Sequence, residues 1–266
     1  ASDVYKRQGI RSPTPVQRCA IPAALRGVDV MALAETGSGK TAAFVLPILQ
    51  RLSEDPYGIF ALVVTPTREL AIQISEQVSA LGAPMGVRVC VVIGGANATQ
   101  QGIEVQRRPH VVVATPGRLI EHIEGPQPPA LDRLRFLVLD EADRILAAGF
   151  APELRKILRV LPNPAPEEEE EEGCASEGRD LLHGNSQSSN NALVVGGLER
   201  QGVFGRQTLL FSATMTNAIE RLRKMASRES AQLFDLTMKQ TMPATLSLEY
   251  LFVPAQVKLT YLVHVL

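Results

Sequence analysis

The chain has 266 residues, with 27 Lys and Arg against 28 Asp and Glu, so its formal net charge is −1; 45% of the residues are hydrophobic and 21% are charged. This composition is typical of a globular domain and excludes a collagen-like chain or one that is disordered throughout. The apolar runs are strand-sized, well below the roughly 20 residues of a membrane-spanning helix, so no membrane association is predicted. Cys19, Cys90 and Cys174 have no CxxC spacing, which favours a reducing intracellular compartment.

The two ends of the chain differ from the rest. Residues 1–8 include a stretch that looks like a translated sequencing adapter, so we expect this leader to lie outside the fold. Residues 256–266 repeat apolar side chains at helical spacing without a capping glycine, which predicts a helix that continues beyond Leu266. We therefore expect the sequence to be part of a longer protein.

Short runs of aliphatic residues alternate with segments of helical periodicity. Strands are predicted at residues 29–33, 60–64, 87–92, 110–114, 136–139 and 207–212, and the helices between them include 69–81 and 152–161. Because the strands are apolar on both faces, this alternation predicts an α/β fold, a parallel sheet covered by helices. In such sheets, ligands bind beyond the carboxyl ends of the strands.

Residues 162–205 break this alternation. They contain six consecutive glutamates at 167–172, then a Ser-, Asn- and Gly-rich part, and hold nine acidic residues and two arginines in all. This composition predicts a disordered acidic insertion. The rest of the chain has 25 basic residues (27 minus 2) and 19 acidic ones (28 minus 9). This surplus is compatible with a polyanionic partner, although a solvated surface is the commoner explanation.

A glycine-rich segment follows the first predicted strand and precedes a helical stretch. It reads Ala34, Glu35, Thr36, Gly37, Ser38, Gly39, Lys40, Thr41. In such a loop, backbone N–H groups surround phosphates, Lys40 neutralises the β- and γ-phosphates, and the Thr41 hydroxyl binds Mg²⁺. The strict pattern has glycine where Ala34 stands, so the sequence predicts a variant P-loop. A glycine-rich turn without a ligand is the alternative, and it explains fewer of these features.

A second chemical signal closes the strand at 136–139. Its next residues are Asp140, Glu141, Ala142 and Asp143. Carboxylates after a strand are often helix caps. At the same sheet edge as Lys40, however, Asp140 can hold Mg²⁺, largely through water, and Glu141 can act on an attacking water. The pair predicts catalytic roles for Lys40, Asp140 and Glu141.

Together with the glycine-rich loop, the Asp-Glu-Ala-Asp tetrad resembles that of DEAD-box ATP-dependent RNA helicases. The resemblance covers the chain from Gly9 to Leu266, apart from the acidic insertion. It implies a RecA-like P-loop NTPase fold that uses ATP and Mg²⁺. Residues 9–17 resemble the adenine-reading motif of the family, in which the Gln17 amide offers both a donor and an acceptor.

Three further segments, each after a predicted strand, resemble the RNA-backbone contacts of the first RecA-like domain. They are Pro66, Thr67 and Arg68; Gly94 and Gly95; and Thr115, Pro116, Gly117 and Arg118. Backbone N–H groups, hydroxyls and arginines suit phosphate and ribose, and none of these residues reads bases. Taken alone, the first and the third of these segments would more readily be explained as a helix start with proline in its first turn. Little sequence specificity is therefore expected.

The segment Ser212, Ala213 and Thr214 follows the last predicted strand. By resemblance, the hydroxyls of Ser212 and Thr214 bond Asp143 and couple ATP hydrolysis to strand separation. The acidic insertion precedes this strand, which places it at the sheet edge opposite the ATP pocket. We expect it to be a solubilising segment; a site for a basic partner and an electrostatic mimic of RNA are the alternatives.

The resemblance implies three segments: a leader at 1–8, a helicase ATP-binding domain at 9–237, and a linker with the start of a second RecA-like domain at 238–266. The second domain would supply the arginine fingers, so this piece alone is expected to bind nucleotide, hydrolyse it poorly and unwind nothing. Residues 53–60, 135–138 and 261–264 look most like the nucleolar branch of ribosome-biogenesis helicases.

That branch implies a monomer that acts on pre-rRNA in the nucleolus, with pre-ribosomal proteins as further partners. Two alternatives use the same residues, namely an ATP-gated RNA clamp that serves as an assembly platform and an inactive nucleotide-binding fragment. A DNA helicase or another P-loop NTPase is disfavoured, because those lack the combination of Gln17 with the other motifs.

Overall fold

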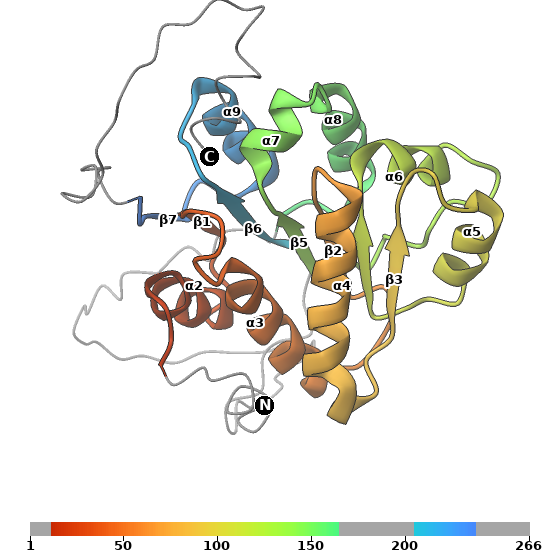
Figure 1. Cartoon of the computed structure of the whole chain (residues 1–266), viewed down its shortest axis with the longest axis horizontal. Helices are drawn as coiled ribbons and strands as arrows, with labels where there is room; N and C mark the ends of the chain where they lie inside the picture. The colour runs from red at the N-terminus through yellow and green to blue at the C-terminus, as the bar shows by residue number, and fades with distance from the viewer. Residues whose placement is uncertain (1–11, 165–204, 238–266) are drawn as a thin grey trace, which may run out of the picture. The chain divides into compact units, whose positions relative to one another are not determined.

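The computed structural model describes residues 12–164 and 205–237 (Figure 1). The leader at 1–8, nearly all of the acidic insertion, and the segment 238–266 lie outside the described residues, so the expectations for them stay predictions. Within the described ranges, no helix combines the length and the apolar composition needed to cross a bilayer.

Seven parallel strands form one sheet in the order β3-β4-β2-β5-β6-β1-β7. Their bounds are β1 Val30–Leu33, β2 Ala61–Val64, β3 Val89–Val92, β4 Val111–Ala114, β5 Phe136–Leu139, β6 Gln207–Ser212 and β7 Gln232–Asp235. All but β7 occupy predicted positions. The sequence analysis missed β7 because it has no buried apolar run; it pairs with β1 at the sheet edge.

Helices follow most strands, as expected for a parallel sheet. They are α2 (Pro15–Leu25), α3 (Lys40–Glu54), α4 (Arg68–Gly82), α5 (Ala98–Gln106), α6 (Pro116–Ile123), α7 (Ala142–Ala147), α8 (Ala151–Val160) and α9 (Asn217–Ala226), with a 3₁₀ turn at Ala83–Met85. The helices predicted at 69–81 and 152–161 match α4 and α8 to within one residue. The α/β fold class is confirmed.

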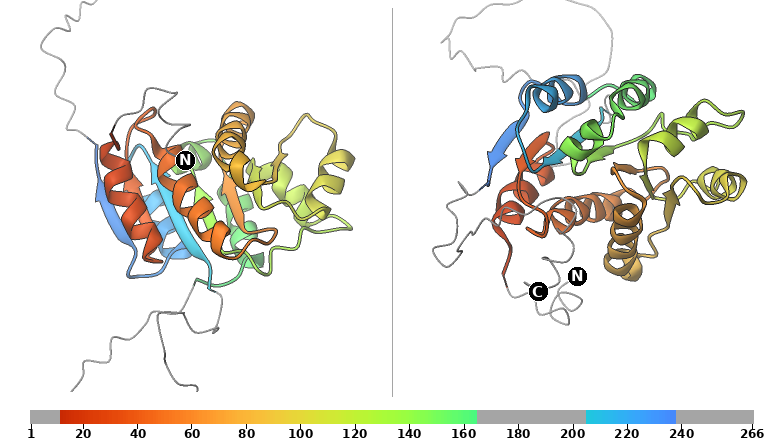
Figure 2. Two further views of the ribbon diagram at one scale, coloured as in Figure 1. Left: turned by 90° about the horizontal axis from the view of Figure 1, so that it is seen from below. Right: turned by 45° about the horizontal axis from the view of Figure 1, so that its top comes forward.

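Alternation along the strands creates two cores, one on each face of the sheet. In β1, Val30 and Ala32 pack in the core beneath α2, α3 and α4, whereas Met31 and Leu33 pack with residues of α6 to α9. Figure 2 shows these helix layers on opposite sides of the sheet. Because both faces are covered, the strand backbones are rigid and position the loops at their carboxyl ends.

A buried carboxylate ties the start of β1 to two distant segments. Asp29 is fully buried. It accepts hydrogen bonds from the N–H groups of Thr208 (2.9 Å) and Arg228 (2.8 Å) and pairs with the Arg228 guanidinium at 3.1 Å. It also lies near the buried Arg206, whose guanidinium donates to the carbonyl of Ala226 at 2.8 Å. Asp29 therefore joins β1, β6 and the end of α9.

Candidate functional site

Three chain segments meet at the carboxyl ends of neighbouring strands. Strand β6 lies between β5 and β1 in the sheet. The loop 34–39 after β1, Asp140 after β5 and Ser212 at the end of β6 therefore lie together at the carboxyl ends of these three strands. The N–H of Ala34 donates to the carbonyl of Ser212 at 2.9 Å, which joins two of them directly. The strand order therefore brings the predicted P-loop beside the predicted acidic residues.

The loop after β1 has the backbone form that binding phosphate requires. Gly37 and Gly39 have φ of 80° and 92°, in the left-handed region that favours glycine. Helix α3 then begins at Lys40, so the N–H groups of its first turn point toward the loop without partners in the helix. Glu35, Thr36 and Gly37 are exposed, and Ser38, Gly39 and Thr41 are half-buried. The Ser38 hydroxyl donates to the carbonyl of Glu35 at 2.7 Å.

Lys40 is buried within this loop. Its side-chain ammonium donates to the carbonyl of Ala34 at 3.1 Å, and only 6% of the residue is exposed. Because Lys40 is the first residue of α3, this hydrogen bond connects the start of the helix to the first residue of the loop. A buried cation with a carbonyl partner at a helix start is suited to receive phosphate oxygens.

Gln17 links α2 to the same loop. Its Nε2 donates to the carbonyl of Gly39 at 3.1 Å, while its Oε1 accepts from the N–H of Thr14 at 3.1 Å. A Cβ at Gly39 would lie 2.5 Å from this Nε2 atom and would displace the amide, and the φ of 92° strains any residue other than glycine. Each amide atom retains one further bonding position, which leaves a donor and an acceptor for a base. Thr14, with Gln17 three residues later, is a capping box that the sequence analysis overlooked.

Asp140 and Glu141 are buried at the end of β5, with 2% and 5% of each residue exposed. Asp140 Oδ1 accepts the N–H of Glu141 at 3.0 Å. Glu141 has φ of 51°, a strained value for this residue type, and its carboxylate pairs with Arg144 at 3.0 Å. Arg144 was missed, although its spacing of three residues on a helix makes such a pair common.

Burial raises the pKa of Asp140 to about 6, even though the nearby Lys40 lowers it. The ionised carboxylate is therefore costly in the chain by itself, and a bound cation would relieve that cost. Within the described ranges, no cluster of three or more His, Cys, Asp or Glu is arranged to hold a metal. A magnesium ion here would accordingly need oxygens of phosphate and water besides those of Asp140 and Thr41. The residues present fit a magnesium nucleotide.

The raised pKa of Asp140 predicts a pH dependence of stability without nucleotide or magnesium. Between about pH 4 and pH 6 the folded chain binds this proton more tightly than the unfolded chain, so the free energy of unfolding falls as pH rises through that window. A shift of two pKa units corresponds to about 2–3 kcal/mol. Denaturant unfolding of the Asp140→Asn variant should lack this decrease; an equal decrease in both proteins would contradict the assignment.

Asp143 contacts one of the two predicted hydroxyls. Thr214 Oγ1 donates to Asp143 Oδ2 at 3.1 Å. Ser212 does not share this bond as the sequence analysis expected, because its hydroxyl donates to the carbonyl of Thr214 at 2.8 Å. Ser212 is fully buried at the end of β6 and cannot reach outward. It braces the turn that presents Thr214 to α7.

The predicted RNA-contact segments also converge. They follow β2, β3 and β4, which are neighbours in the sheet. Arg68 begins α4 and lies over the turn at Gly94 and Gly95: a Cβ on Gly95 would lie 2.3 Å from the Arg68 guanidinium. The Thr67 hydroxyl caps α4 by accepting the N–H of Leu70 at 3.2 Å, and Pro66 is half-buried before it.

The segment after β4 joins the same turn. Arg118 donates to the carbonyl of Ala96 at 3.5 Å and pairs with Glu121 at 2.9 Å. Thr115 and Pro116 are buried at the start of α6, and Gly117 is half-buried. The structure therefore places two arginines and two helix starts around the glycine turn, which together form a cationic surface suited to phosphates.

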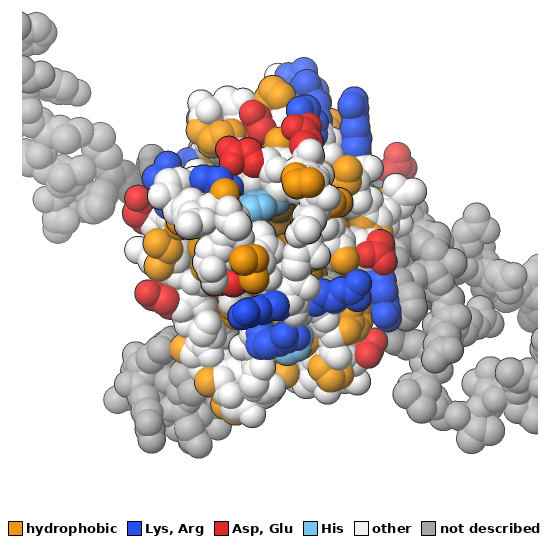
Figure 3. Space-filling model, turned by 90° about the vertical axis from the view of Figure 1, so that its right-hand side faces the viewer, with side chains coloured by type: hydrophobic (Ala, Val, Ile, Leu, Met, Phe, Trp, Pro, Cys, Tyr) orange, Lys and Arg blue, Asp and Glu red, His pale blue; other side chains and the backbone are white. Residues whose placement is uncertain are grey.

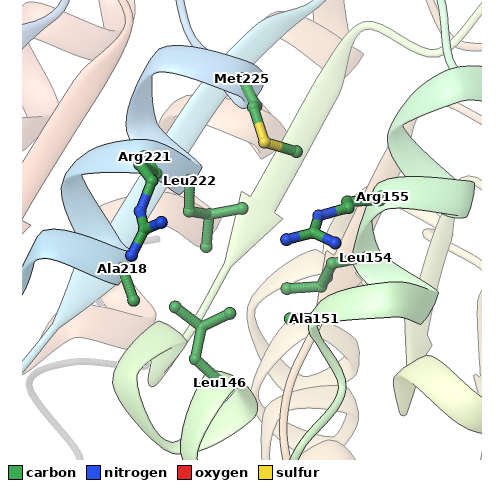
Figure 4. A pocket seen from close by; sticks show the side chains of 8 residues that line it. All are labelled: Leu146, Ala151, Leu154, Arg155, Ala218, Arg221, Leu222 and Met225. Atoms are coloured by element: carbon green, nitrogen blue, oxygen red, sulfur yellow. The ribbon is translucent and has the colours of Figure 1, made fainter.

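A shallow pocket of about 170 Å³ lies elsewhere, between α7, α8 and α9. Figure 4 shows its mostly apolar lining, with Arg155 and Arg221 on opposite sides. It contains none of the predicted site residues. A search for cavities alone would therefore not have identified the phosphate loop.

A parallel sheet with a glycine-rich turn between β1 and α3, and acidic residues after β5, defines the chain as a P-loop nucleotide-binding domain. A family description, "DEAD/DEAH box helicase", matches residues 14–222. This chain belongs to the DEAD/DEAH box helicase family.

Individual relatives agree. The chain is 43% identical to a human protein named "Probable ATP-dependent RNA helicase DDX49", over 98% of this chain and 46% of that protein. It is 43% identical to the Aspergillus niger "ATP-dependent rRNA helicase rrp3", over 99% of this chain and 48% of that one. The crystal structure of a DEAD box protein from Methanococcus jannaschii matches with a TM-score of 0.68 and 28% identity, over 88% of this chain and 52% of that one. The chain thus spans about half the length of these relatives.

Proposed function

We propose that this chain is the ATP-binding half of an ATP-dependent RNA helicase. One arrangement supports this: the phosphate loop, the buried acids and the cationic turn all lie at the carboxyl edge of one sheet. In the proposal, residues 9–237 form the first RecA-like domain. Residues 238–266 lead into a second domain that completes the catalytic site.

Each residue of the proposed ATP site has a distinct chemical role. Lys40 binds the β- and γ-phosphates and neutralises part of their charge, and the N–H groups of the loop donate hydrogen bonds to them. Thr41 and Asp140 hold Mg²⁺, largely through water, and the ion would supply charge neutralisation on the phosphates when bound. Glu141 orients the attacking water and accepts its proton. Gln17 reads adenine while remaining bonded to Gly39.

RNA would bind to the cationic surface of Arg68, Gly94, Gly95 and Arg118, with Pro66, Thr67, Thr115, Pro116 and Gly117 contributing backbone and hydroxyl contacts. The backbone-directed chemistry of these groups supports binding with little sequence preference. Thr214 and Asp143 connect α7 to the end of β6, and we propose that this hydrogen bond couples the state of the nucleotide to the RNA surface.

The relatives' names support a narrower proposal. Because one relative is named an rRNA helicase, we propose pre-rRNA as the substrate, pre-ribosomal proteins as partners and the nucleolus as the location of a monomeric protein. Crosslinking of the full-length protein to RNA in cells, followed by sequencing of the recovered RNA, tests this part separately. Enrichment of pre-rRNA is the expected result, and recovery of RNAs only in proportion to their abundance would contradict it.

The Lys40→Ala variant tests the ATP site. Loss of one charge-assisted contact costs about 1.5–3 kcal/mol, so affinity for a fluorescent ATP analogue should fall about 10- to 150-fold. Lys156→Ala is the matched control, because Lys156 is an exposed lysine of α8 that pairs with Glu124. Equal affinity of the Lys40 variant and the control would contradict the proposal.

A further inference from the structure

Four exposed arginines lie at the amino-terminal ends of strands, at the end of the sheet opposite the phosphate loop. Arg88 precedes β3, Arg107 and Arg108 precede β4, and Arg133 lies in the segment that leads into β5. We call these four residues the arginine row. Since β3, β4, β2 and β5 are neighbours in that order, the row extends about 14 Å at about 4.8 Å per strand. Figure 3, viewed from the β3 side, shows basic side chains gathered beside a histidine in the lower half of that face.

Backbone and ring contacts hold part of the arginine row in place. The Arg88 guanidinium donates to the carbonyls of Arg107 and Arg108 at 3.1 and 2.9 Å. The backbone N–H of Arg88 donates to Nδ1 of His110 at 3.0 Å. The Arg133 guanidinium lies 4.7 Å from the centre of the Tyr57 ring. These contacts hold the guanidinium groups of Arg88 and Arg133 and the backbone of Arg107 and Arg108 at one end of the sheet.

No carboxylate balances this charge among the residues that the structure describes. The ion pairs found within those ranges all involve other basic residues, and the nearest acids along the chain, Glu104 and Asp132, form none with the row. Like charges at this separation repel one another, and an anion that binds them all removes the repulsion. The arginine row is therefore a surface for a polyanion.

The glutamate run, residues 167–172, is attached at the same edge. The backbones of Pro164 and Arg206 form an isolated parallel β-bridge, and the N–H of Gln207 donates to the carbonyl of Arg135 at 2.9 Å. The chain therefore leaves the described residues beside the start of β5. Glu172 follows Pro164 by eight residues, a distance of at most about 29 Å. A short tether of this kind gives an effective concentration in the millimolar range.

We propose that the arginine row binds the glutamate run of its own chain, and that this contact keeps RNA and other polyanions away from the amino-terminal edge of the sheet. Six carboxylates are available for four guanidinium groups, enough to neutralise the row. RNA is thereby directed to the opposite edge, where the loops after β2, β3 and β4 lie. The contact requires neither nucleotide nor catalysis, so it stands apart from the proposed ATPase.

The other basic surface near the run is on α8 and α9, beside the pocket of Figure 4. There Lys156 and Arg223 already pair with Glu124 and Glu220, and Arg221 donates to the carbonyl of Asn217 at 3.2 Å. Arg155 and Arg221 face each other across that pocket. Arg155 and Arg159 of this surface are exposed and form none of the ion pairs found in the described ranges. This surface is therefore the competing site for the glutamate run, and its arginines serve as matched controls.

Zero-length crosslinking of the whole chain tests the contact directly. In the Arg107→Lys variant, a carbodiimide should join the new amine to a glutamate at 167–172, as read by peptide mass mapping. Because the Debye length is only about 3 Å at 1 M salt, the link should disappear there. Arg155→Lys is the control and should link weakly. Absence of the link at position 107, or a stronger link at 155, overturns the proposal.

The affinity of the chain for RNA tests the consequence of the contact between the arginine row and the glutamate run. With all six glutamates replaced by glutamine, the chain should bind a single-stranded polyuridine about tenfold more tightly in low salt without nucleotide, measured by fluorescence anisotropy. Adding Arg107→Gln, Arg108→Gln and Arg133→Gln should remove this gain, whereas adding Arg155→Gln and Arg221→Gln should not. A gain that survives loss of the row, or no gain at all, overturns the proposal. Lys40→Ala should leave this gain unchanged, which separates it from failure of the ATP site.

Discussion

Replacing Glu141 by glutamine is expected to slow ATP hydrolysis about 10²- to 10⁴-fold in the full-length protein, because a neutral amide cannot accept the proton of the attacking water. Nucleotide and RNA binding should persist, since Lys40 and the cationic turn are untouched. Single-turnover hydrolysis and equilibrium nucleotide binding, measured on the same preparation, separate the two effects.

The fold should tolerate this change. The Glu141 side chain is 7% exposed and pairs with Arg144, whose side chain is 62% exposed. Glutamine has the size of glutamate and keeps an oxygen that can accept from Arg144, whose own charge stays in contact with water. Glu124→Gln is the matched control, because Glu124 pairs with Lys156 on the surface and its side chain is 54% exposed. Turnover that is unchanged in the Glu141 variant would remove Glu141 from the mechanism.

Replacing Asp29 by alanine is expected to lower the free energy of unfolding by about 3–5 kcal/mol, the usual cost of breaking a buried charge pair from one side. The change leaves the N–H groups of Thr208 and Arg228 without their acceptor and removes the charge beside buried Arg206. Denaturant unfolding measures the loss. Asp29→Asn, which keeps an acceptor oxygen, should lose less.

Asp132→Ala is the control for this stability effect. Asp132 is exposed, so its replacement should change the free energy of unfolding by less than about 0.5 kcal/mol. The ATP site lies at the opposite end of β1, so the fraction of Asp29→Ala protein that remains folded should bind nucleotide normally. A loss below about 1 kcal/mol would mean that Asp29 is not the anchor described above.

The sequence predicted the central strands because they are buried on both faces and read as unbroken aliphatic runs. Strand β7 was missed for the opposite reason: its side chains are mostly exposed, and pairing with β1 stabilises it. The phosphate loop and the acids after β5 were recognisable because their chemistry depends on residues that are adjacent in the chain. Their catalytic roles stay predictions until the variants above are measured.

The sequence by itself determined the family, the α/β class and the candidate ATP residues, since each depends on local spacing within one strand-loop-helix unit. Only the tertiary structure decided which distant groups touch. Thr214 reaches Asp143 across 71 residues while Ser212 turns inward, and Arg68 covers Gly95. The arginine row forms from the segments that lead into three separate strands, β3, β4 and β5. Those contacts depend on strand order and parallel register, which are set by the packing of the whole sheet and by no short stretch of sequence.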